Sequence, residues 1–104
     1  MLRGMKARKE QQEPNSAAGT VWFLYILKCG DGTFYTGVTT DIERRLRMHQ
    51  EGTASRYTRT RRPVALVYRE ECAGRSQSLA RECAVKALSR RRKEELVSGK
   101  KSDG

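Results

Sequence analysis

The apolar positions of residues 21–52 follow first a strand pattern and then a helix pattern. "VWFLYILK" (21–28) is apolar on both alternating faces and rich in aromatic and branched residues, which is typical of a strand in the middle of a sheet. "GDG" (30–32) is a turn signal, and "TFYTGVT" (33–39) predicts a second strand that completes a hairpin. Thr40 and Glu43 have the spacing of a capping box, so we expect a helix that begins there and ends near Gly52.

The second half of the chain predicts one more strand and two helices. Pro63 precedes "VALVYRE", which has the composition of a third strand. Each later helix is preceded by serines that can cap it: Ser76 or Ser78 before residues 79–88, and Ser89 before residues 90–97, with Gly99 at the end. The order ββαβαα predicts the α/β (α+β) class, with a small three-stranded antiparallel sheet flanked by helices and the first strand in its centre.

The length of 104 residues corresponds to one domain, which we place at residues 21–98. Residues 1–20 are polar and poor in large apolar groups, so we expect a disordered basic N-terminal arm, and residues 99–104 predict a disordered tail. No apolar run approaches the length of a membrane span. The three cysteines are odd in number and lack the spacing of metal ligands, which predicts reduced thiols in a cytoplasmic protein and neither a zinc site nor a disulfide framework.

The net charge of +10 is concentrated in two segments. Residues 41–62 carry seven arginines against three acidic residues, and residues 75–101 carry nine basic residues against three acidic ones. This excess favours a polyanionic partner, and a nucleic acid is the first candidate. The plainer alternative is that the basic residues keep a small protein soluble.

His49, the one histidine of the chain, lies in the first predicted helix. At 100° per residue, Ile42 and Leu46 define the buried stripe of that helix, and Arg45 and His49 lie one turn apart on its shoulder. We therefore expect His49 at the rim between helix and sheet, neither in the core nor free on the surface. The other polar side chains of this helix are expected to point away: Arg44, Arg47 and Glu51. On geometry alone, such a histidine and arginine pair is more often incidental than catalytic.

The same geometry applied to the next helix predicts a buried stripe of Leu79, Cys83 and Ala87. Glu82 and Lys86 then lie on its shoulder, four residues apart. The simpler interpretation is an ordinary helix salt bridge. The alternative is that the Glu82 carboxylate faces the same cleft as the arginine and histidine of the first helix.

The hairpin carries one tyrosine on each strand, Tyr25 and Tyr35. A two- or four-residue turn would place them on opposite faces, whereas a three-residue loop pairs Tyr25 with Gly37 and places both rings on one face. Gly32 suits the left-handed position that a three-residue loop requires. Gly37 would then leave space beside the phenol of Tyr25. The alternative is that both tyrosines are present only because they form strands well.

Taken together, these residues resemble the GIY-YIG nuclease domain, and in particular its small stand-alone bacterial branch, the YhbQ-like proteins. The resemblance rests on Tyr25, on Tyr35-Thr36-Gly37, on Arg45 eight residues after the glycine, on His49 four residues further, and on a helical Glu82. It covers residues 21 to about 97. The first motif reads Phe-Leu-Tyr where the family has Gly-Ile-Tyr, and Val38 stands where some branches carry a lysine.

The resemblance implies a metal-dependent endonuclease. A divalent ion, Mg²⁺ or Mn²⁺, would be held through Glu82. Tyr25 would be the general base that activates water, and Tyr35 would position it. Arg45 would hold the scissile phosphate, His49 would support proton transfer, and the glycine of the second motif, Gly37, would have a structural role.

The remaining basic side chains are expected to bind the nucleic-acid backbone: Arg44, Arg56, Arg59, Arg61, Arg62 and Lys86. DNA is favoured over RNA as the partner, and the preferred substrate structure, for example a branch, stays open. Specificity would come from the shape of the substrate, a homodimer or a protein partner. The competing hypothesis is a non-catalytic nucleic-acid-binding module, in which "SRYTRTRRP" (55–63) tracks a backbone and stacks a base on Tyr57.

Overall fold

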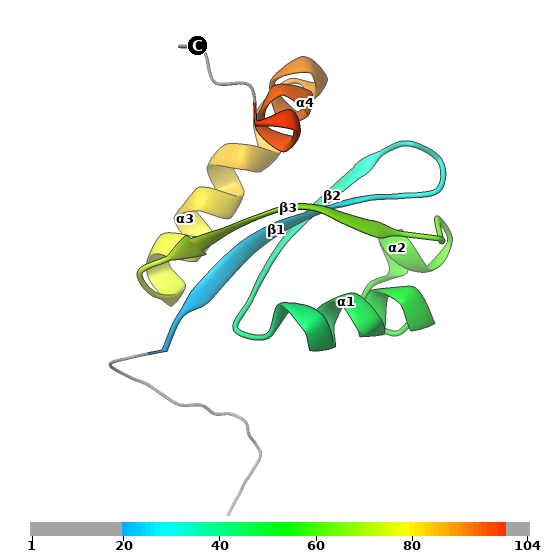
Figure 1. The fold of residues 1–104 in the computed structure, drawn as a ribbon, viewed down its shortest axis with the longest axis horizontal. Coiled ribbons are helices and arrows are strands. Elements are labelled where there is room, and N and C mark those ends of the chain that lie inside the picture. The colour runs from blue at the N-terminus through cyan, green and yellow to red at the C-terminus, as the bar shows by residue number, and fades with distance from the viewer. Residues whose placement is uncertain (1–19, 100–104) are drawn as a thin grey trace, which may run out of the picture.

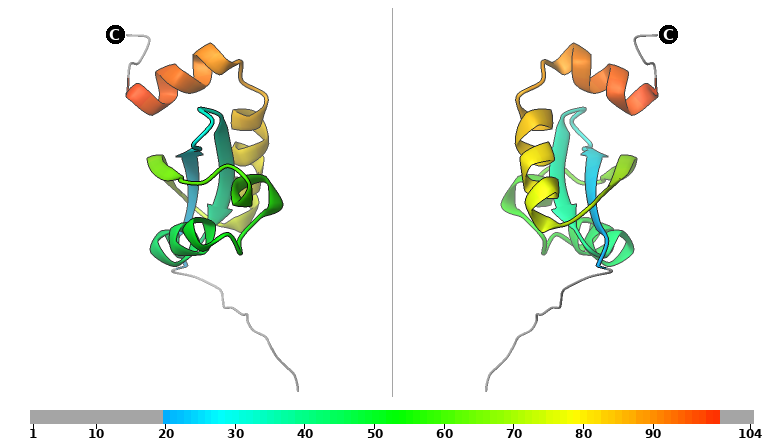
Figure 2. Two further views of the ribbon diagram at one scale, coloured as in Figure 1. Left: turned by 90° about the vertical axis from the view of Figure 1, so that its right-hand side faces the viewer. Right: turned by 90° about the vertical axis from the view of Figure 1, so that its left-hand side faces the viewer.

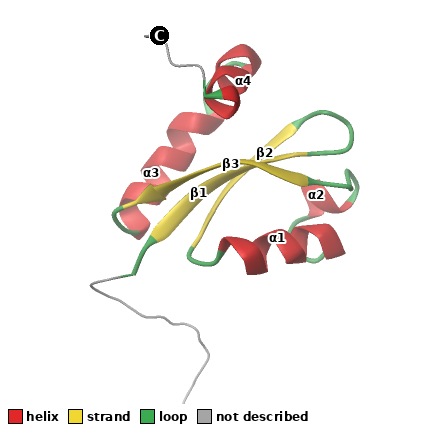
Figure 3. Ribbon diagram, in the orientation of Figure 1, coloured by secondary structure: helices red, strands yellow, loops and turns green. Residues whose placement is uncertain are grey.

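The computed structural model describes residues 20–99, which form a three-stranded antiparallel sheet with helices around it (Figures 1 and 3). The strands are β1 (Trp22–Lys28), β2 (Phe34–Thr39) and β3 (Ala65–Cys72), in the order β2-β1-β3. The predicted fold class and the central position of the first strand are therefore confirmed. The disordered arm and tail expected at the two ends lie, except for Thr20 and Gly99, outside the described residues.

The β1–β2 hairpin has the predicted three-residue loop. The amide of Cys29 donates to the carbonyl of Thr33 at 2.8 Å, and Gly32 adopts the left-handed conformation with φ 86°. As a result Tyr25 lies opposite Gly37, which is the register inferred from the sequence. An even-numbered turn would have moved one tyrosine to the other face of the sheet.

The central strand contributes to two hydrophobic clusters, one on each face of the sheet. Leu24 and Ile26 are fully buried with Val85 of helix α3 (Arg75–Lys86). The alternate residues of β1, including Tyr25, form the other cluster with Ile42 of helix α1 (Ile42–Glu51). Helix α4 (Arg90–Ser98) adds its apolar side chains to the α3 cluster. Figure 2 shows α3 running beside β2, with α1 across the opposite end of the sheet from α4.

Helices α1 and α4 begin close to the predicted positions. The N-cap of α1 is Asp41, whose carboxylate accepts from the backbone amide of Arg44 at 3.1 Å, so the predicted cap at Thr40 was one residue early. Ser89 caps α4 and Gly99 ends it in a left-handed conformation, as predicted. None of the helices within residues 20–99 is long and apolar enough to cross a membrane.

Helix α3 differs from the prediction in its start and in its buried face. It begins at Arg75 after Gly74, and Ser78 is a buried helical residue whose hydroxyl donates to the carbonyl of Arg75 at 2.7 Å. The residues of the predicted buried stripe are exposed, including Leu79 at 37%. Val85 packs against the sheet instead, and Ser78 is buried as well, because a serine that bonds its own helix can be buried as readily as a small apolar residue. The predicted caps at Ser76 or Ser78 and the predicted stripe were therefore wrong.

The one-turn helix α2 (Arg56–Arg59) was not predicted. Ser55 caps it by accepting from the backbone amide of Thr58 at 3.1 Å. Thr58 is fully buried. A helix of four residues is too short to show an apolar period, so the hydrophobic pattern holds no signal for it.

Candidate active site

A hydrogen-bonded tyrosine and histidine form the centre of the candidate site. The hydroxyl of Tyr25, on the central strand, lies 2.9 Å from Nε2 of His49, in the last turn of α1. Both side chains are buried, with exposed fractions of 4% and 1%. His49 was expected at the rim of the helix and sheet, and that expectation was wrong. It is seven residues from Ile42, so the two side chains point within about 20° of each other and are buried together.

Gly37 provides the space in which the phenol of Tyr25 lies. A Cβ atom at this position would lie 2.6 Å from the Tyr25 hydroxyl oxygen and 2.7 Å from the ring carbon that carries it. No side chain larger than glycine fits there unless the ring moves. The phenol therefore extends across the edge strand β2 toward the margin of the sheet, as the register predicted.

Tyr35 also contacts the histidine. Its ring centroid is 5.0 Å from that of His49, edge to face, and 5.9 Å from that of Tyr57, with an interplanar angle of 28°. Tyr25 makes a similar edge contact with His49 at 5.8 Å. The structure thus brings both hairpin tyrosines onto one imidazole.

Burial determines the protonation of this cluster. It raises the pKa of Tyr25 well above the ordinary value for a phenol; the neighbouring Tyr35 adds to the rise and the positive charge of Arg45 opposes it. Burial lowers the pKa of His49 to about 4, and Arg45 contributes to the lowering. At neutral pH the pair is therefore a protonated phenol and an uncharged imidazole.

The charges of Arg45 and Glu82 both act on the Tyr25 phenol. The charge of Arg45, which is half-buried on α1, acts on both Tyr25 and His49. The carboxylate of Glu82 raises the pKa of Tyr25 in addition to burial. Glu82 is carried by α3, which packs against the face of the sheet opposite Tyr25 and contacts β2.

The donor groups near Tyr25 fit one kind of metal ion. Within residues 20–99 no three His, Cys, Asp or Glu side chains gather in one place, so Glu82 would be a single protein ligand. Its side chain is 21% exposed and one oxygen lies 3.2 Å from Nζ of Lys86, whose own side chain is 57% exposed. A single accessible carboxylate suits Mg²⁺, which keeps several water ligands and takes the rest from substrate phosphates. It does not suit a structural zinc ion, which needs four ligands.

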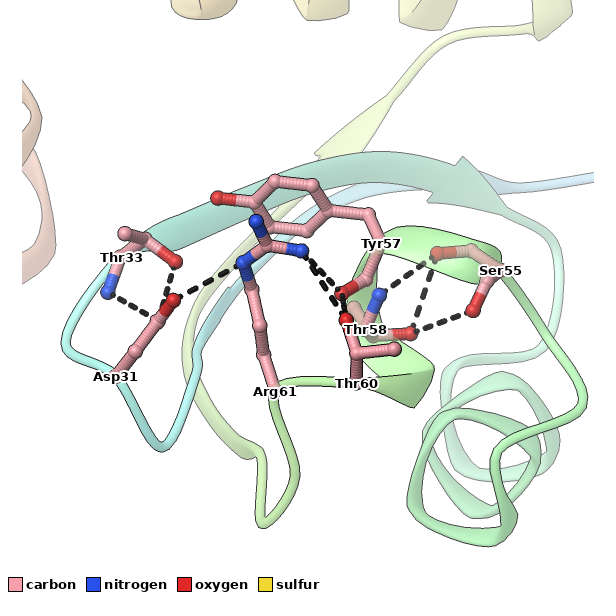
Figure 4. Close-up of polar contacts among 7 residues, drawn as sticks. All are labelled: Asp31, Thr33, Ser55, Tyr57, Thr58, Thr60 and Arg61. Carbon is pink, nitrogen blue, oxygen red and sulfur yellow. Dashed lines mark hydrogen bonds and ion pairs between the residues drawn. The ribbon is translucent and has the colours of Figure 1, made fainter.

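Two of the arginines expected to bind nucleic acid contact the protein itself. Nε of Arg61 lies 3.0 Å from a carboxylate oxygen of Asp31, and its guanidinium lies 3.8 Å above the ring of Tyr57 (Figure 4). Nε of Arg62 donates to the carbonyl of Arg59 at 3.1 Å. The other arginines expected to bind nucleic acid are exposed: Arg44, Arg56 and Arg59.

The hydroxyl of Thr58 is the polar group of the site that the sequence did not reveal. Its Oγ1 lies 2.8 Å from Nδ1 of His49, so both imidazole nitrogens have a partner. The available signal was Ser55 three residues before it, which has the spacing of an N-cap to its bonded amide. Nothing in the hydrophobic pattern indicates that this threonine is buried.

Comparison with known proteins shows the family to which the chain belongs. A sequence model of the GIY-YIG catalytic domain matches residues 21–95. The UPF0213 protein DP2720 of Desulfotalea psychrophila is 56% identical over 77 residues, which cover 73% of this chain and 70% of that protein. The UPF0213 protein SSP2268 of Staphylococcus saprophyticus is 46% identical over 76 residues, covering 73% and 93%.

Two solved structures are similar as well. The solution NMR structure of the UPF0213 protein BH0048 from Bacillus halodurans has a TM-score of 0.51 and 45% identity, over 77% of this chain and 85% of that one. The solution NMR structure of EF2693 from E. faecalis has a TM-score of 0.53 and 40% identity, over 76% and 84%. The chain therefore belongs to the GIY-YIG family of nuclease domains.

Proposed function

We propose that this protein is a metal-dependent endonuclease that hydrolyses phosphodiester bonds in nucleic acid, with DNA as the favoured substrate. The observation that carries the proposal is the buried hydrogen bond between Tyr25 and His49, which ends at the space beside Gly37 and lies in the fields of Arg45 and Glu82. A structural role alone would not require a buried phenol bonded to an imidazole, with a cation and a carboxylate that both act on the pKa of that phenol.

In this proposal Tyr25 accepts a proton from the attacking water and passes its own proton to His49. A free phenol with a pKa of about 10 is ionised in only about one molecule in a thousand at pH 7, and burial makes the phenolate rarer still. Water activation by a pre-formed phenolate would therefore be inefficient. An uncharged imidazole 2.9 Å away removes the difficulty, because it can take the phenol proton as the water proton arrives.

General base catalysis is not sufficient for this reaction. It contributes about 10²–10⁴ in rate, or roughly 3–5 kcal/mol, whereas slow uncatalysed reactions require barrier reductions of up to about 23 kcal/mol. In the proposal Arg45 binds the scissile phosphate and stabilises its developing negative charge. A divalent ion held through Glu82 would supply further positive charge to the phosphate and the leaving oxygen. Tyr35, in contact with His49, would restrict where the water can lie.

The alternative is a nucleic-acid-binding module without cleavage, and one observation favours it. Glu82 is paired with Lys86 four residues later, which is the arrangement of an ordinary helix salt bridge. The stacking role assigned to Tyr57 in that alternative has less support, because the Arg61 guanidinium already covers one face of its ring.

The test is incubation of the purified protein with duplex, single-stranded and branched DNA, and with RNA, in Mg²⁺, Mn²⁺ or a chelator. Glu82→Ala should abolish cleavage and leave binding nearly unchanged. Glu94→Ala is the matched control, because Glu94 also pairs with a basic residue four positions away, Arg90 on α4, and both changes remove one negative charge. Cleavage that persists in chelator, or an equal effect of the two substitutions, would leave the binding module as the better account.

A further inference from the structure

We propose that Thr58 is a positioning residue that holds His49 in the tautomer with the proton on Nδ1, which leaves Nε2 free to accept the proton of Tyr25. The inference rests on the proposed function for its catalytic meaning. The position of the proton, however, is a property of the folded chain that can be measured without any substrate.

The geometry around Thr58 is that of an enclosed polar chain. Its side chain is fully buried, and Oγ1 lies 2.8 Å from Nδ1 of His49. The same Oγ1 lies 3.2 Å from the hydroxyl of Ser55 and 3.5 Å from the carbonyl oxygen of Ser55 (Figure 4). Thr58 therefore has acceptors for its own proton other than the histidine.

Tyr25 has no such choice. Among residues 20–99, the hydrogen-bond partner of its buried hydroxyl is His49. If Nε2 carried the proton, it would donate to the phenol, and the Tyr25 proton would have no protein acceptor. If Nδ1 carries the proton, Nδ1–H donates to Thr58, the threonine hydroxyl donates to Ser55, and the tyrosine hydroxyl donates to Nε2. Buried donors are rarely left without an acceptor, so the second arrangement is favoured.

The one-turn helix α2 is attached to the rest of the protein in a way that fixes Thr58. Arg61 donates to the carbonyl of Tyr57 at 3.0 Å and pairs with Asp31 in the hairpin loop. Asp31 in turn accepts from the backbone amide of Thr33 at 3.0 Å (Figure 4). The carbonyl of Arg61 also accepts from the amide of Gly30 at 2.7 Å. The loop between the two tyrosine-bearing strands thus anchors the segment that supplies the partner of Nδ1.

This attachment has a consequence for the choice of tautomer. The hydrogen bonds that the two ring nitrogens make decide which of them carries the proton in a neutral histidine, so Nδ1–H needs an acceptor with a fixed position. A hydroxyl on a mobile surface loop would not serve, because it would exchange with water. Thr58 meets the requirement, since it is buried, the Ser55 cap holds the start of its helix, and the backbone amide of Arg61 donates to the carbonyl of Thr58 at 3.0 Å.

The test is ¹⁵N NMR of the imidazole at neutral pH in the full chain, made without added histidines. Because the sequence holds one histidine, every imidazole signal comes from His49. The wild type should give a protonated-type shift for Nδ1 and an unprotonated-type shift for Nε2. Thr58→Val keeps the shape but removes the hydroxyl, and should move the equilibrium toward Nε2–H. Thr58→Ser keeps the hydroxyl and should restore the wild-type pattern.

A wild-type spectrum with the proton on Nε2 would overturn the proposal, and so would a Thr58→Val spectrum identical to that of the wild type. If Thr58→Val does not fold, the wild-type and Thr58→Ser spectra decide the matter. Where cleavage is measurable, Thr58→Val should slow it by roughly 10- to 100-fold, the effect known for groups that orient metal-binding histidines, and Thr58→Ser should not. A wild type with Nδ1–H that cuts no substrate would refute the nuclease proposal and leave the tautomer assignment intact.

Discussion

Replacing Gly37 by alanine is the most direct perturbation of the Tyr25–His49 pair. The added methyl group would lie 2.6 Å from the tyrosine oxygen, whereas an ordinary contact begins at 3.4 Å. The phenol would have to move by about 0.8 Å, since Gly37 belongs to a strand that is hydrogen-bonded to the core. The ring is buried, so this movement both strains its packing and disturbs the 2.9 Å hydrogen bond to His49.

The expected cost follows from these two effects. Overpacking of a buried site costs about 1–3 kcal/mol. Loss of a hydrogen bond between buried groups adds roughly 1 kcal/mol. Gly37→Ala should therefore lower the free energy of unfolding by about 2–4 kcal/mol, a large part of the roughly 5–15 kcal/mol typical of a small domain. With a urea m-value of about 1–2 kcal/mol/M, the midpoint should fall by roughly 1–4 M.

The assay is urea unfolding followed by circular dichroism, with Gly74→Ala as the control. A Cβ atom at Gly74 would meet no atom within 4 Å, and its φ of −174° is extended backbone that alanine can adopt. Because Gly74 is the N-cap of α3, where alanine is less favourable than glycine, Gly74→Ala should cost up to about 1 kcal/mol, which is less than the cost expected at Gly37. If Gly37→Ala unfolds at the same urea concentration as this control, the phenol does not lie where the register puts it.

Two further predictions concern charge. The His49 imidazole should remain uncharged until the pH falls to about 4, which its C–H proton signals will show. Because the folded pKa lies below the unfolded value of about 6.5, the contribution of His49 to stability should be constant above pH 6.5 and fall by about 3 kcal/mol on going to pH 4, taken as the difference between the wild type and a His49→Gln variant; a His49 that titrates near 6.5 would contradict the burial argument. Arg44→Ala with Arg59→Ala should lower the slope of log affinity against log salt by about 0.7–0.9 for each phosphate that the protein no longer neutralises, as measured by titration of labelled DNA. Arg61→Ala should lower that slope less than Arg44→Ala or Arg59→Ala alone, because the guanidinium of Arg61 is already paired with Asp31. An equal decrease would contradict the view that Arg61 binds the protein and not the phosphate backbone.

The hairpin could be predicted in detail because local rules determine it. A three-residue loop with a left-handed glycine allows one register, and that register alone placed Tyr25 opposite Gly37. The central position of β1 could be predicted equally well, since only a strand covered on both faces has a run of apolar residues on both alternating faces, here residues 22–27. The caps at Ser89 and Gly99 also follow from local chemistry.

Features that depend on tertiary packing were not accessible from the pattern. The helical period of the apolar side chains predicted that Leu79 is buried on α3. In the structure Leu79 is exposed, and Val85 and Ser78 are buried. His49 appeared to be a rim residue because polarity was taken to mean exposure, whereas two polar partners allow it to be buried. One of those partners, Thr58, comes from a helix of a single turn whose place is determined by contacts to a distant loop.

The central claim is that Tyr25 and Glu82 act together in one phosphodiester-cleaving site. It is tested most directly by the single-turnover cleavage rates of Tyr25→Phe, Glu82→Ala and the double variant in Mg²⁺, on whichever substrate the wild type cuts. Each single change should slow cleavage by at least about 10²-fold, and the double variant should be scarcely slower than the worse single one, because residues of one catalytic unit are strongly non-additive. A wild-type rate in either single variant, or two decreases that simply multiply in the double variant, would contradict the account.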